Sequence, residues 1–191
     1  MLLAKLALRD QLLTTRGRRP LVEIGEDARR IADRVLALAE VRRASTVAAY
    51  VSMGTEPGTS ALLAGLQSAG KRVILPVLRP DNDLDWAVYE GPDALVPAAR
   101  GLLEPGGELL GADAIATADV VLVPGLAVAP TGMRLGRGGG SYDRALGRVT
   151  VGTFTCVLLY DDEVGVEVPA EPHDRPVTAA VSPAGITRFA G

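Results

Sequence analysis

The segment TVAAYVSMGTEPGTSALLAGLQSAGKRVILPV, residues 46–77, decides the fold class of this 191-residue chain. Thr46–Val51 and Arg72–Val77 are short apolar runs of the kind that forms strands covered on both faces. Thr59–Ala69, between them, has helical spacing, a Thr or Ser cap at its start and Gly70 just past its end. A strand, a helix and a second strand in this order predict one βαβ unit.

The same alternation continues on both sides of this unit. Before it, two helical patterns cover roughly Leu2–Thr15 and Glu26–Glu40. After it, further strands are predicted at Leu84–Tyr89, Val120–Val123, Thr153–Leu159 and Val177–Val181. We find no internal repeat and no interdomain linker, so we expect a single domain over residues 1–191. Alternating strands and helices predict a three-layer α/β/α fold with a mostly parallel sheet.

Two unusual loops follow predicted strands. Ser52–Gly58 comes after the first strand, and Gly125–Gly140 is a long connection with six glycines. A loop of that length in a compact domain usually has a function. Since parallel sheets bind ligands at the carboxyl ends of their strands, both loops are candidates for a site. Gly91–Gly111, rich in glycine and proline, is expected to wrap the surface.

Charge and composition limit the kinds of molecule that this protein is expected to bind. The formal net charge of −3 argues against a nucleic-acid binder, which needs a broad basic surface. Lys5, Arg9 and Asp10 interrupt the N-terminal apolar run, so it does not resemble a signal peptide, and no run approaches the ~20 residues that span a bilayer. Cys156 is the only cysteine, and we expect it to be a buried, inert thiol. We therefore expect a cytoplasmic protein, a monomer or small homo-oligomer, that acts on small molecules.

The sharpest chemical signal is LGRGGGSYD, Leu135–Asp143. Its glycines can adopt positive φ, so that successive N–H groups form an anion nest. Arg134 and Arg137 add guanidinium groups that match phosphate oxygens. The segment lacks the Gly-Lys-Ser/Thr of a Walker A loop and the third glycine of the dinucleotide fingerprint. A tight surface turn would be the better interpretation of a bare triple glycine, but the flanking arginines, Tyr142 and Asp143 favour phosphate binding.

The longer segment VPGLAVAPTGMRLGRGGGSYDR, Val123–Arg144, resembles the signature of the 5-formyltetrahydrofolate cyclo-ligase family. That signature is Pro-Gly-Leu, a short spacer and Arg-Leu-Gly-Arg-Gly-x-Gly-Tyr-Tyr-Asp. Lys5 and Arg9 are similar to the family's N-terminal Lys-x-x-x-Arg, and Tyr50–Thr59 is similar to the strand and loop that carry a substrate-binding glutamate. His173-Asp174 matches a His/Asn-Asp position before the last strand. These matches follow the family's order along nearly the whole chain.

The resemblance implies ATP- and Mg²⁺-dependent closure of 5-formyltetrahydrofolate to 5,10-methenyltetrahydrofolate. It also implies a fold resembling the ribose-5-phosphate isomerase and CoA-transferase group. Contacts with ATP are expected from Lys5, Arg9, Arg134, Leu135, Gly136, Arg137, Gly138, Gly139, Gly140, Ser141 and Tyr142. Contacts with the folate are expected from Val51, Glu56, Arg137, Gly138, Gly139, Gly140 and Ser141. Asp143 and Asp174 are expected to serve the magnesium, and we assign catalytic roles to Arg137 and Tyr142.

Several of these residues have an ordinary interpretation when taken alone. Lys5 and Arg9 lie i, i+4 on a helix, where like charges repel by ~0.2–0.5 kcal/mol, so they indicate either an anion site or a solvated basic face. Glu56 can accept two hydrogen bonds from an amino-pyrimidinone edge, or it is a solvated loop glutamate. Asp143 fits a magnesium ligand or a helix-start aspartate, and Asp174 fits a turn residue equally well.

Two positions depart from the family pattern. Ser141 replaces the first tyrosine of Tyr-Tyr-Asp, and Gly139 stands where many relatives have lysine. These departures keep open a folate- or nucleotide-binding module without activity, and the expected fold keeps open a sugar-phosphate isomerase or CoA-transferase relative. His173, the only histidine, is interpreted as structural or peripheral, and Trp86 and Tyr89 as core or pocket wall.

Overall fold

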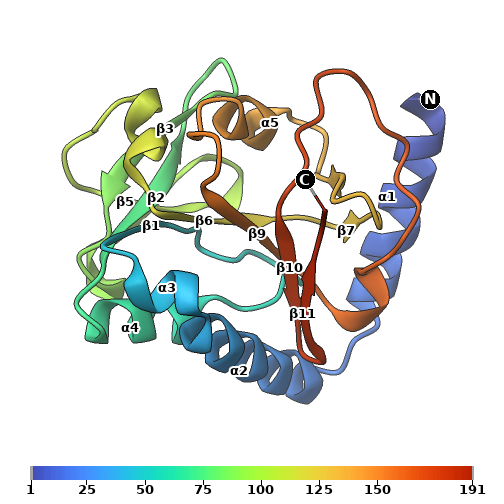
Figure 1. Ribbon diagram of the computed structural model, residues 1–191, viewed down its shortest axis with the longest axis horizontal. Coiled ribbons are helices and arrows are strands. Elements are labelled where there is room, and N and C mark those ends of the chain that lie inside the picture. The colour runs from blue at the N-terminus through green and yellow to red at the C-terminus, as the bar shows by residue number, and fades with distance from the viewer. Residues whose placement is uncertain (1, 191) are drawn as a thin grey trace.

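The computed structural model describes residues 2–190 and contains a seven-stranded sheet in the order β11-β10-β9-β6-β1-β2-β3 (Figure 1). The five inner strands are parallel, and the edge strands β3 and β11 run antiparallel to their neighbours. The strands of this sheet are β1 Thr46–Ala48, β2 Arg72–Leu78, β3 Leu84–Val88, β6 Val120–Pro124, β9 Phe154–Leu158, β10 Ala179–Ser182 and β11 Gly185–Arg188. The prediction of a mostly parallel sheet is confirmed.

Helices cover both faces of the sheet, as expected for a three-layer fold. One face carries α2 Leu21–Ala37, α3 Ala39–Arg43 and α4 Ser60–Ser68. The other carries the short α5, Ser141–Leu146, and the 3₁₀ helix η3, Ala112–Thr117. The helix α1, Leu2–Gly17, lies to one side of the sheet, near the small β7–β8 hairpin (Figure 1). Further 3₁₀ turns are η1 Pro92–Ala94, η2 Ala99–Gly101 and η4 Asp161–Glu163.

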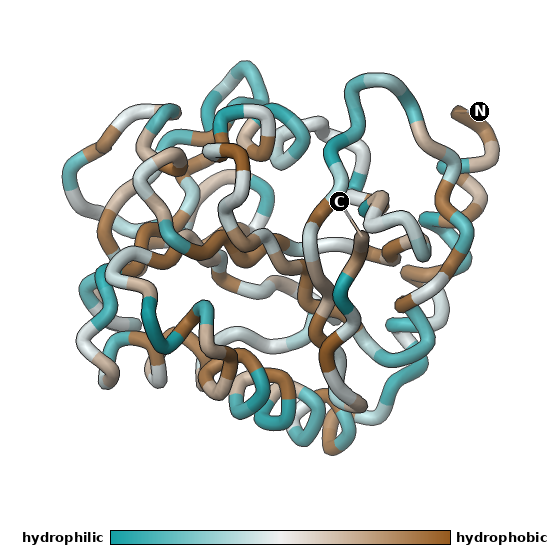
Figure 2. Tube along the Cα trace, in the orientation of Figure 1, coloured by the Kyte–Doolittle hydropathy of each residue, from teal (hydrophilic) through white to brown (hydrophobic). Residues whose placement is uncertain are grey.

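The inner strands alternate their side chains between two apolar clusters. In β6, Val120 and Leu122 face the α2–α4 side, whereas Val121 and Val123 face the α5 side. Because both faces are buried, these strands are continuous apolar runs rather than alternating ones. Figure 2 shows the hydrophobic colouring concentrated along these strands. Cys156 is fully buried, as predicted, and burial raises the pKa of its thiol to about 12.

Two predicted boundaries are wrong for identifiable reasons. The second helix begins at Leu21, directly after Pro20, and ends at Ala37, because Leu38 is extended with φ −63° and ψ 135°. Its first turn carries exposed apolar residues, which obscured the helical pattern. The first strand ends at Ala48 rather than at residue 51, since β6 pairs with Val47 and Ala48 alone.

The structure also contains short strands that the sequence pattern did not reveal. The segment 91–111 includes a hairpin of β4 Leu95–Pro97 and β5 Leu103–Pro105, and the segment 125–140 includes β7 Ala127–Val128 and β8 Arg134–Leu135. The last predicted strand is β10, shifted to residues 179–182, and β11 follows it as an edge strand. β4, β5 and β11 carry exposed side chains and leave no continuous apolar run, whereas β7 and β8 are buried but only two residues long, too short to show a strand pattern.

β1 and β6 are parallel neighbours, and the strands of this sheet that follow them are added on opposite sides of the pair. From β1 the chain passes through α4 on one face to β2, and from β6 it passes through α5 on the opposite face to β9. The loops that leave two adjacent parallel strands therefore diverge, which opens a crevice at their carboxyl ends. Both unusual loops of the sequence begin at this crevice.

Candidate functional site

A cavity of about 730 Å³ occupies the crevice at the carboxyl ends of the inner strands. The loop after β1, the loop after β6, the helix α1, the β4–β5 hairpin and the segment 171–174 all contribute walls. Every site residue predicted from the sequence lines this cavity: Lys5, Arg9, Val51, Glu56, Arg134, Leu135, Gly136, Arg137, Gly138, Gly139, Gly140, Ser141, Tyr142, Asp143 and Asp174. The fold thus brings together residues that are far apart in the sequence.

The glycine-rich loop lies against Arg9 of α1. Gly138 has φ 102° and Gly140 has φ 72°, a region that L side chains rarely adopt. A Cβ on Gly138 would lie 3.3 Å from Cζ of Arg9, so glycine also provides the room for this guanidinium. Arg9 donates from Nε to the carbonyl of Gly136 at 2.8 Å, and among residues 2–190 no carboxylate pairs with it. Its remaining N–H groups are suited to an anion.

Arg134 packs against the glycine loop and bonds to residues before and after it. It donates to the carbonyl of Pro124 at 3.0 Å and to Oδ1 of Asp143 at 3.2 Å. Burial lowers the pKa of its guanidinium, and the Asp143 carboxylate acts in the opposite direction. A Cβ on Gly136 would lie 2.7 Å from Arg134 Nη1, so a larger residue at this position would displace the Arg134 guanidinium. Leu135 points into the third apolar cluster and is 1% exposed.

Lys5 is buried among carboxylates instead of lying on a solvated basic face. Its ammonium is 2.8 Å from Oε2 of Glu171 and 2.8 Å from Oδ2 of Asp174. Burial works to lower the pKa of Lys5, but the hydrogen bonds to Asp174 and Glu171 outweigh it and raise that pKa. These carboxylates offset the repulsion expected between Lys5 and Arg9. Glu171 was missed by sequence reasoning, because nothing local distinguishes it from other loop acids.

The acidic side chains at the cavity do not form one cluster. Glu171, His173 and Asp174 hold potential ligand atoms within 4.8 Å of one another. Within the described chain Asp143 is not part of this group and instead pairs with Arg134. The two residues predicted to serve magnesium therefore line one cavity from separate segments, each next to a cation.

Glu56 is 7% exposed, so it is not a solvated loop residue. Its Oε2 accepts a hydrogen bond from the N–H of Met53 at 2.9 Å, and its Oε1 lies 3.2 Å from Nε of Arg137. Reciprocal bonds between Ser52 and Thr59 close the base of the same loop, at 2.9 and 3.0 Å. The loop thus presents a carboxylate at the cavity next to a half-exposed arginine side chain.

Two tyrosine hydroxyls at the cavity are buried without a hydrogen-bond partner among residues 2–190. They belong to Tyr50, just past β1, and Tyr142, in the first turn of α5. Burial raises the pKa of both phenols, which stay protonated. Since an unsatisfied buried hydroxyl costs ~1–3 kcal/mol, polar groups of a ligand would be favourable here. Tyr50 was not assigned a role from the sequence, where it looked like one more apolar strand residue.

Comparison with known proteins agrees with this geometry. Residues 3–183 match the model of the 5-formyltetrahydrofolate cyclo-ligase family. The chain belongs to this family. The match spans both unusual loops, α1 through Lys5 and Arg9, and the 171–174 segment, so it covers every predicted site residue of the cavity.

Relatives in the cyclo-ligase family cover most of the chain. The 5-formyltetrahydrofolate cyclo-ligase of Mycolicibacterium smegmatis is 47% identical over 143 residues, covering 72% of this chain and 73% of that protein. The Escherichia coli K12 enzyme of the same name is 33% identical over 167 residues, covering 86% and 90%. The 5,10-methenyltetrahydrofolate synthetase of Aquifex aeolicus superposes with a TM-score of 0.84 at 27% identity, over 97% of this chain and 92% of that one.

A second solved structure supports the fold. The 5,10-methenyltetrahydrofolate synthetase of Mycoplasma pneumoniae has a TM-score of 0.75 at 20% identity, covering 94% of this chain and 98% of that one. The predicted likeness to the ribose-5-phosphate isomerase and CoA-transferase group stays a prediction, and these cyclo-ligase relatives give no support to a sugar-phosphate isomerase. No helix in residues 2–190 combines the length and the apolar character that a membrane crossing needs.

Proposed function

We propose that this chain catalyses the ATP-dependent closure of 5-formyltetrahydrofolate to 5,10-methenyltetrahydrofolate, with release of ADP and phosphate. The observation that carries the proposal is the position of the family's glycine signature. It forms one wall of a cavity that is also lined by Glu56, the residue that matches the family's substrate glutamate. The cavity thus offers phosphate-binding and heterocycle-binding groups to two ligands that must react with each other.

The cavity walls suggest how the two ligands share it. The triphosphate would lie along Gly136–Ser141, where backbone N–H groups and the guanidinium of Arg9 are available. Lys5 would add positive charge from α1, although two carboxylates now hold its ammonium. The pteridine would lie against Val51, with its amino-pyrimidinone edge on Glu56 and a polar atom near the Tyr50 hydroxyl.

The proposed reaction must first activate the N5-formyl group. The N5-formyl group is an amide and resists attack by N10. Transfer of the γ-phosphoryl group of ATP to the formyl oxygen makes an imidoyl phosphate with a good leaving group. N10 then attacks the formyl carbon and loses its proton, the bond from that carbon to the phosphate oxygen breaks, and the five-membered ring closes. The departing phosphate takes up the proton.

Arg137 and Tyr142 are the residues we assign to this transfer. The Arg137 side chain is 45% exposed and lies 3.2 Å from Glu56, at the boundary between the two ligand regions. Its guanidinium can neutralise charge that develops on the phosphoryl oxygens. The Tyr142 hydroxyl, protonated and without a partner in the described chain, can donate a hydrogen bond to a phosphoryl or formyl oxygen.

Magnesium fits the residues that line the cavity. Mg²⁺ prefers one or two carboxylates together with phosphate oxygens and water, and Asp143 and Asp174 would supply carboxylates from two sides. Each uses one oxygen on a neighbouring cation. The other oxygen of Asp143 has no partner within residues 2–190, and that of Asp174 lies 3.6 Å from Nε2 of His173. When bound, the ion would neutralise charge on the β- and γ-phosphates. We also propose that the protein acts in the cytoplasm as a monomer or small homo-oligomer.

A direct assay tests the proposed function. Purified protein, Mg·ATP and 5-formyltetrahydrofolate should give a product that absorbs at longer wavelength, because the methenyl bridge conjugates N5 with N10. ADP should appear in equal amount and should depend on the folate. Folded protein at high concentration that produces neither signal would refute the assignment, and ADP release without folate would indicate a simple ATPase.

A further inference from the structure

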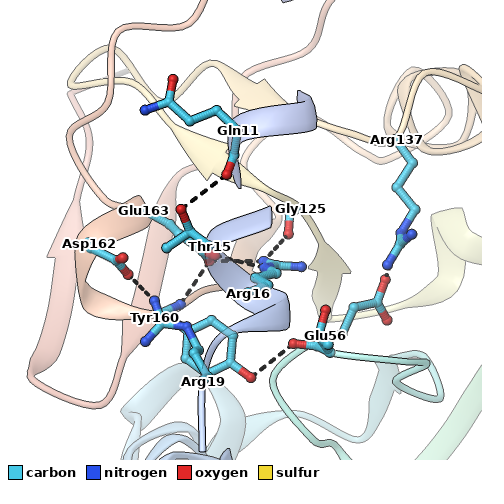
Figure 3. A network of polar contacts seen from close by, with 11 residues as sticks. Gln11, Thr15, Arg16, Arg19, Glu56, Gly125, Arg137, Tyr160, Asp162 and Glu163 are labelled. Atoms are coloured by element: carbon cyan, nitrogen blue, oxygen red, sulfur yellow. Dashed lines mark hydrogen bonds and ion pairs between the residues drawn. The ribbon is translucent and has the colours of Figure 1, made fainter. Parts of the chain in front are cut away.

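A buried arginine of α1 forms an ion pair with η4 and a hydrogen bond to the start of the glycine-loop segment. Arg16 is fully buried and contacts both carboxylate oxygens of Glu163, from Nε at 2.7 Å and from Nη2 at 2.8 Å (Figure 3). The same Nη2 donates to the carbonyl of Gly125 at 2.7 Å. Gly125 directly follows β6, so Arg16 holds the point where the long loop leaves the sheet.

The network continues through Tyr160 to the loop that carries Glu56. Glu163 accepts the backbone N–H of Tyr160 at 3.0 Å, and the Arg19 guanidinium lies 4.0 Å from the centre of the tyrosine ring. The Tyr160 hydroxyl donates to the carbonyl of Thr55 at 2.9 Å. Thr55 immediately precedes Glu56, whose carboxylate faces Arg137 (Figure 3).

The loop that carries Glu56 has few polar contacts with the rest of the molecule. Its hydrogen bonds at Ser52, Met53 and Thr59 are internal to the loop. Thr59 already belongs to the start of α4, where its carbonyl accepts the N–H of Leu63. Among the hydrogen bonds of the described chain, the Tyr160 hydroxyl and the Arg137 side chain are what reach residues 53–58 from outside. Arg137 is itself half-exposed on the other ligand loop, whereas Tyr160 is fully buried. Tyr160 is therefore the rigid support of this loop.

We propose that Tyr160, fixed in place by Arg16 and Glu163, is a positioning residue that sets Glu56 for the folate. This inference rests on the proposed function, because it takes Glu56 to contact the substrate. Tyr160 does not line the cavity, so it acts through the Thr55 carbonyl and not by touching a ligand. A displacement of about 1 Å in a positioned group is enough to change substrate affinity or rate markedly.

The variant Tyr160→Phe removes one hydroxyl and keeps the ring, whose centre lies 4.0 Å from Cζ of Arg19 and 5.6 Å from Cζ of Arg16. We expect KM for 5-formyltetrahydrofolate to rise about threefold to tenfold, the range for loss of one neutral hydrogen bond, with KM for ATP changed less than about twofold. Tyr89→Phe is the matched control, because Tyr89 is a buried tyrosine that does not line the cavity. If Tyr160 had only a structural role, Tyr160→Phe would change the free energy of unfolding, and the KM values for folate and ATP would change alike or not at all.

A double-mutant cycle with Glu56→Gln tests whether Tyr160 acts through Glu56. If it does, adding Tyr160→Phe to Glu56→Gln should raise the folate KM by much less than Tyr160→Phe does in the wild-type background. Fully multiplicative effects of the two substitutions on that KM would overturn the inference. An equal rise of both KM values in Tyr160→Phe, or no rise, would overturn it as well.

Hydrogen exchange separates this inference from the proposed function. In ligand-free protein, Tyr160→Phe should speed exchange of the amides of residues 53–56, and Tyr89→Phe should not. If wild-type protein shows no cyclo-ligase turnover, the proposed function fails and this comparison still decides the positioning claim. Unchanged exchange in Tyr160→Phe would overturn the claim whatever the activity.

Discussion

At the scale of single residues, opposite-charge contacts hold the side chains that line the cavity. Lys5 meets Glu171 and Asp174, Arg134 meets Asp143, and Arg137 meets Glu56. Because the partners are partly or fully buried, deletion of one charge leaves the other without its counter-ion and costs stability. Informative substitutions at this site therefore keep the shape of the side chain, and each needs a stability measurement beside the kinetic one.

The substitution Asp143→Asn tests the proposed magnesium role. Asparagine keeps one carbonyl oxygen but removes the charge that favours Mg²⁺, so the Mg²⁺ concentration for half-maximal rate should rise and kcat should fall. Arg134 also loses its counter-ion, and we expect a stability loss of ~1–3 kcal/mol in denaturant melts. Asp33→Asn, at an exposed residue of α2 that forms no ion pair within residues 2–190, is the control. Overlapping Mg²⁺ titrations for Asp143→Asn and wild type would remove Asp143 from the metal site.

The substitution Tyr50→Phe tests whether a ligand satisfies the buried Tyr50 hydroxyl. In the free protein the change removes an unpartnered buried group, so the free energy of unfolding should stay level or increase by ~1 kcal/mol. KM for 5-formyltetrahydrofolate should rise severalfold while KM for ATP is little changed. Tighter folate binding in the variant would show that the hydroxyl faces no polar group of the substrate.

At the scale of elements, an ion pair joins the β2–β3 connection to the segment after α5. Arg148 contacts both carboxylate oxygens of Asp83, at 2.7 and 2.6 Å. Hydrogen bonds from Arg148 lower the pKa of Asp83 to about 2. Since α5 begins where the glycine loop ends, this contact steadies one side of the cavity wall.

The pH dependence of stability tests that contact. Asp83 has a lower pKa in the folded protein than in the unfolded chain, so it stabilises the fold above about pH 4, and this contribution is lost as the pH falls towards about 2. Asp83→Asn should be less stable than wild type at pH 6, and the difference should narrow between about pH 4 and 2. Denaturant melts across this range measure it. A difference that stays constant with pH would contradict the ion-pair account.

The inner strands and the outer strands differ in how well the sequence predicts them. Val120–Val123 is buried on both faces, and its apolar run gave the correct strand. The edge strand β11 and the β4–β5 hairpin carry exposed side chains, so their residues pack too little to leave a pattern. The end of β1 was also missed, because the residues after Ala48 remain apolar where they leave the sheet to line the cavity.

At the scale of the whole molecule, one cavity serves both ligands, so each should stabilise the fold. A ligand at about 100 times its Kd adds ~2.7 kcal/mol, which corresponds to roughly 5–11 °C in Tm for a chain of this size. Mg·ATP and 5-formyltetrahydrofolate should each raise Tm when added alone. In Glu56→Gln the shift with folate should shrink while the shift with Mg·ATP persists. If neither ligand raises the Tm of wild-type protein, the cavity is not their binding site.

The sequence by itself determined the features that depend on local chemistry. The apolar runs predicted the inner parallel strands, and the glycines predicted a loop that needs positive φ, as Gly138 and Gly140 have. The order of the motifs predicted the family that the comparison then established. Each of these follows from side-chain size, backbone freedom or hydrophobicity within a short stretch of chain.

Only the tertiary structure decided which charges and hydroxyls meet. Lys5 pairs with Asp174 across 169 positions, and Arg16 bonds to Glu163 across 147. The sequence showed Lys5 as part of a basic helix face, and it gave Arg16 and Tyr160 no role. The free energy of a buried charge depends on what lies within a few ångströms, and that is fixed by how α1 packs beside the sheet. The placement of Glu56 by Tyr160 is a property of the folded molecule for the same reason.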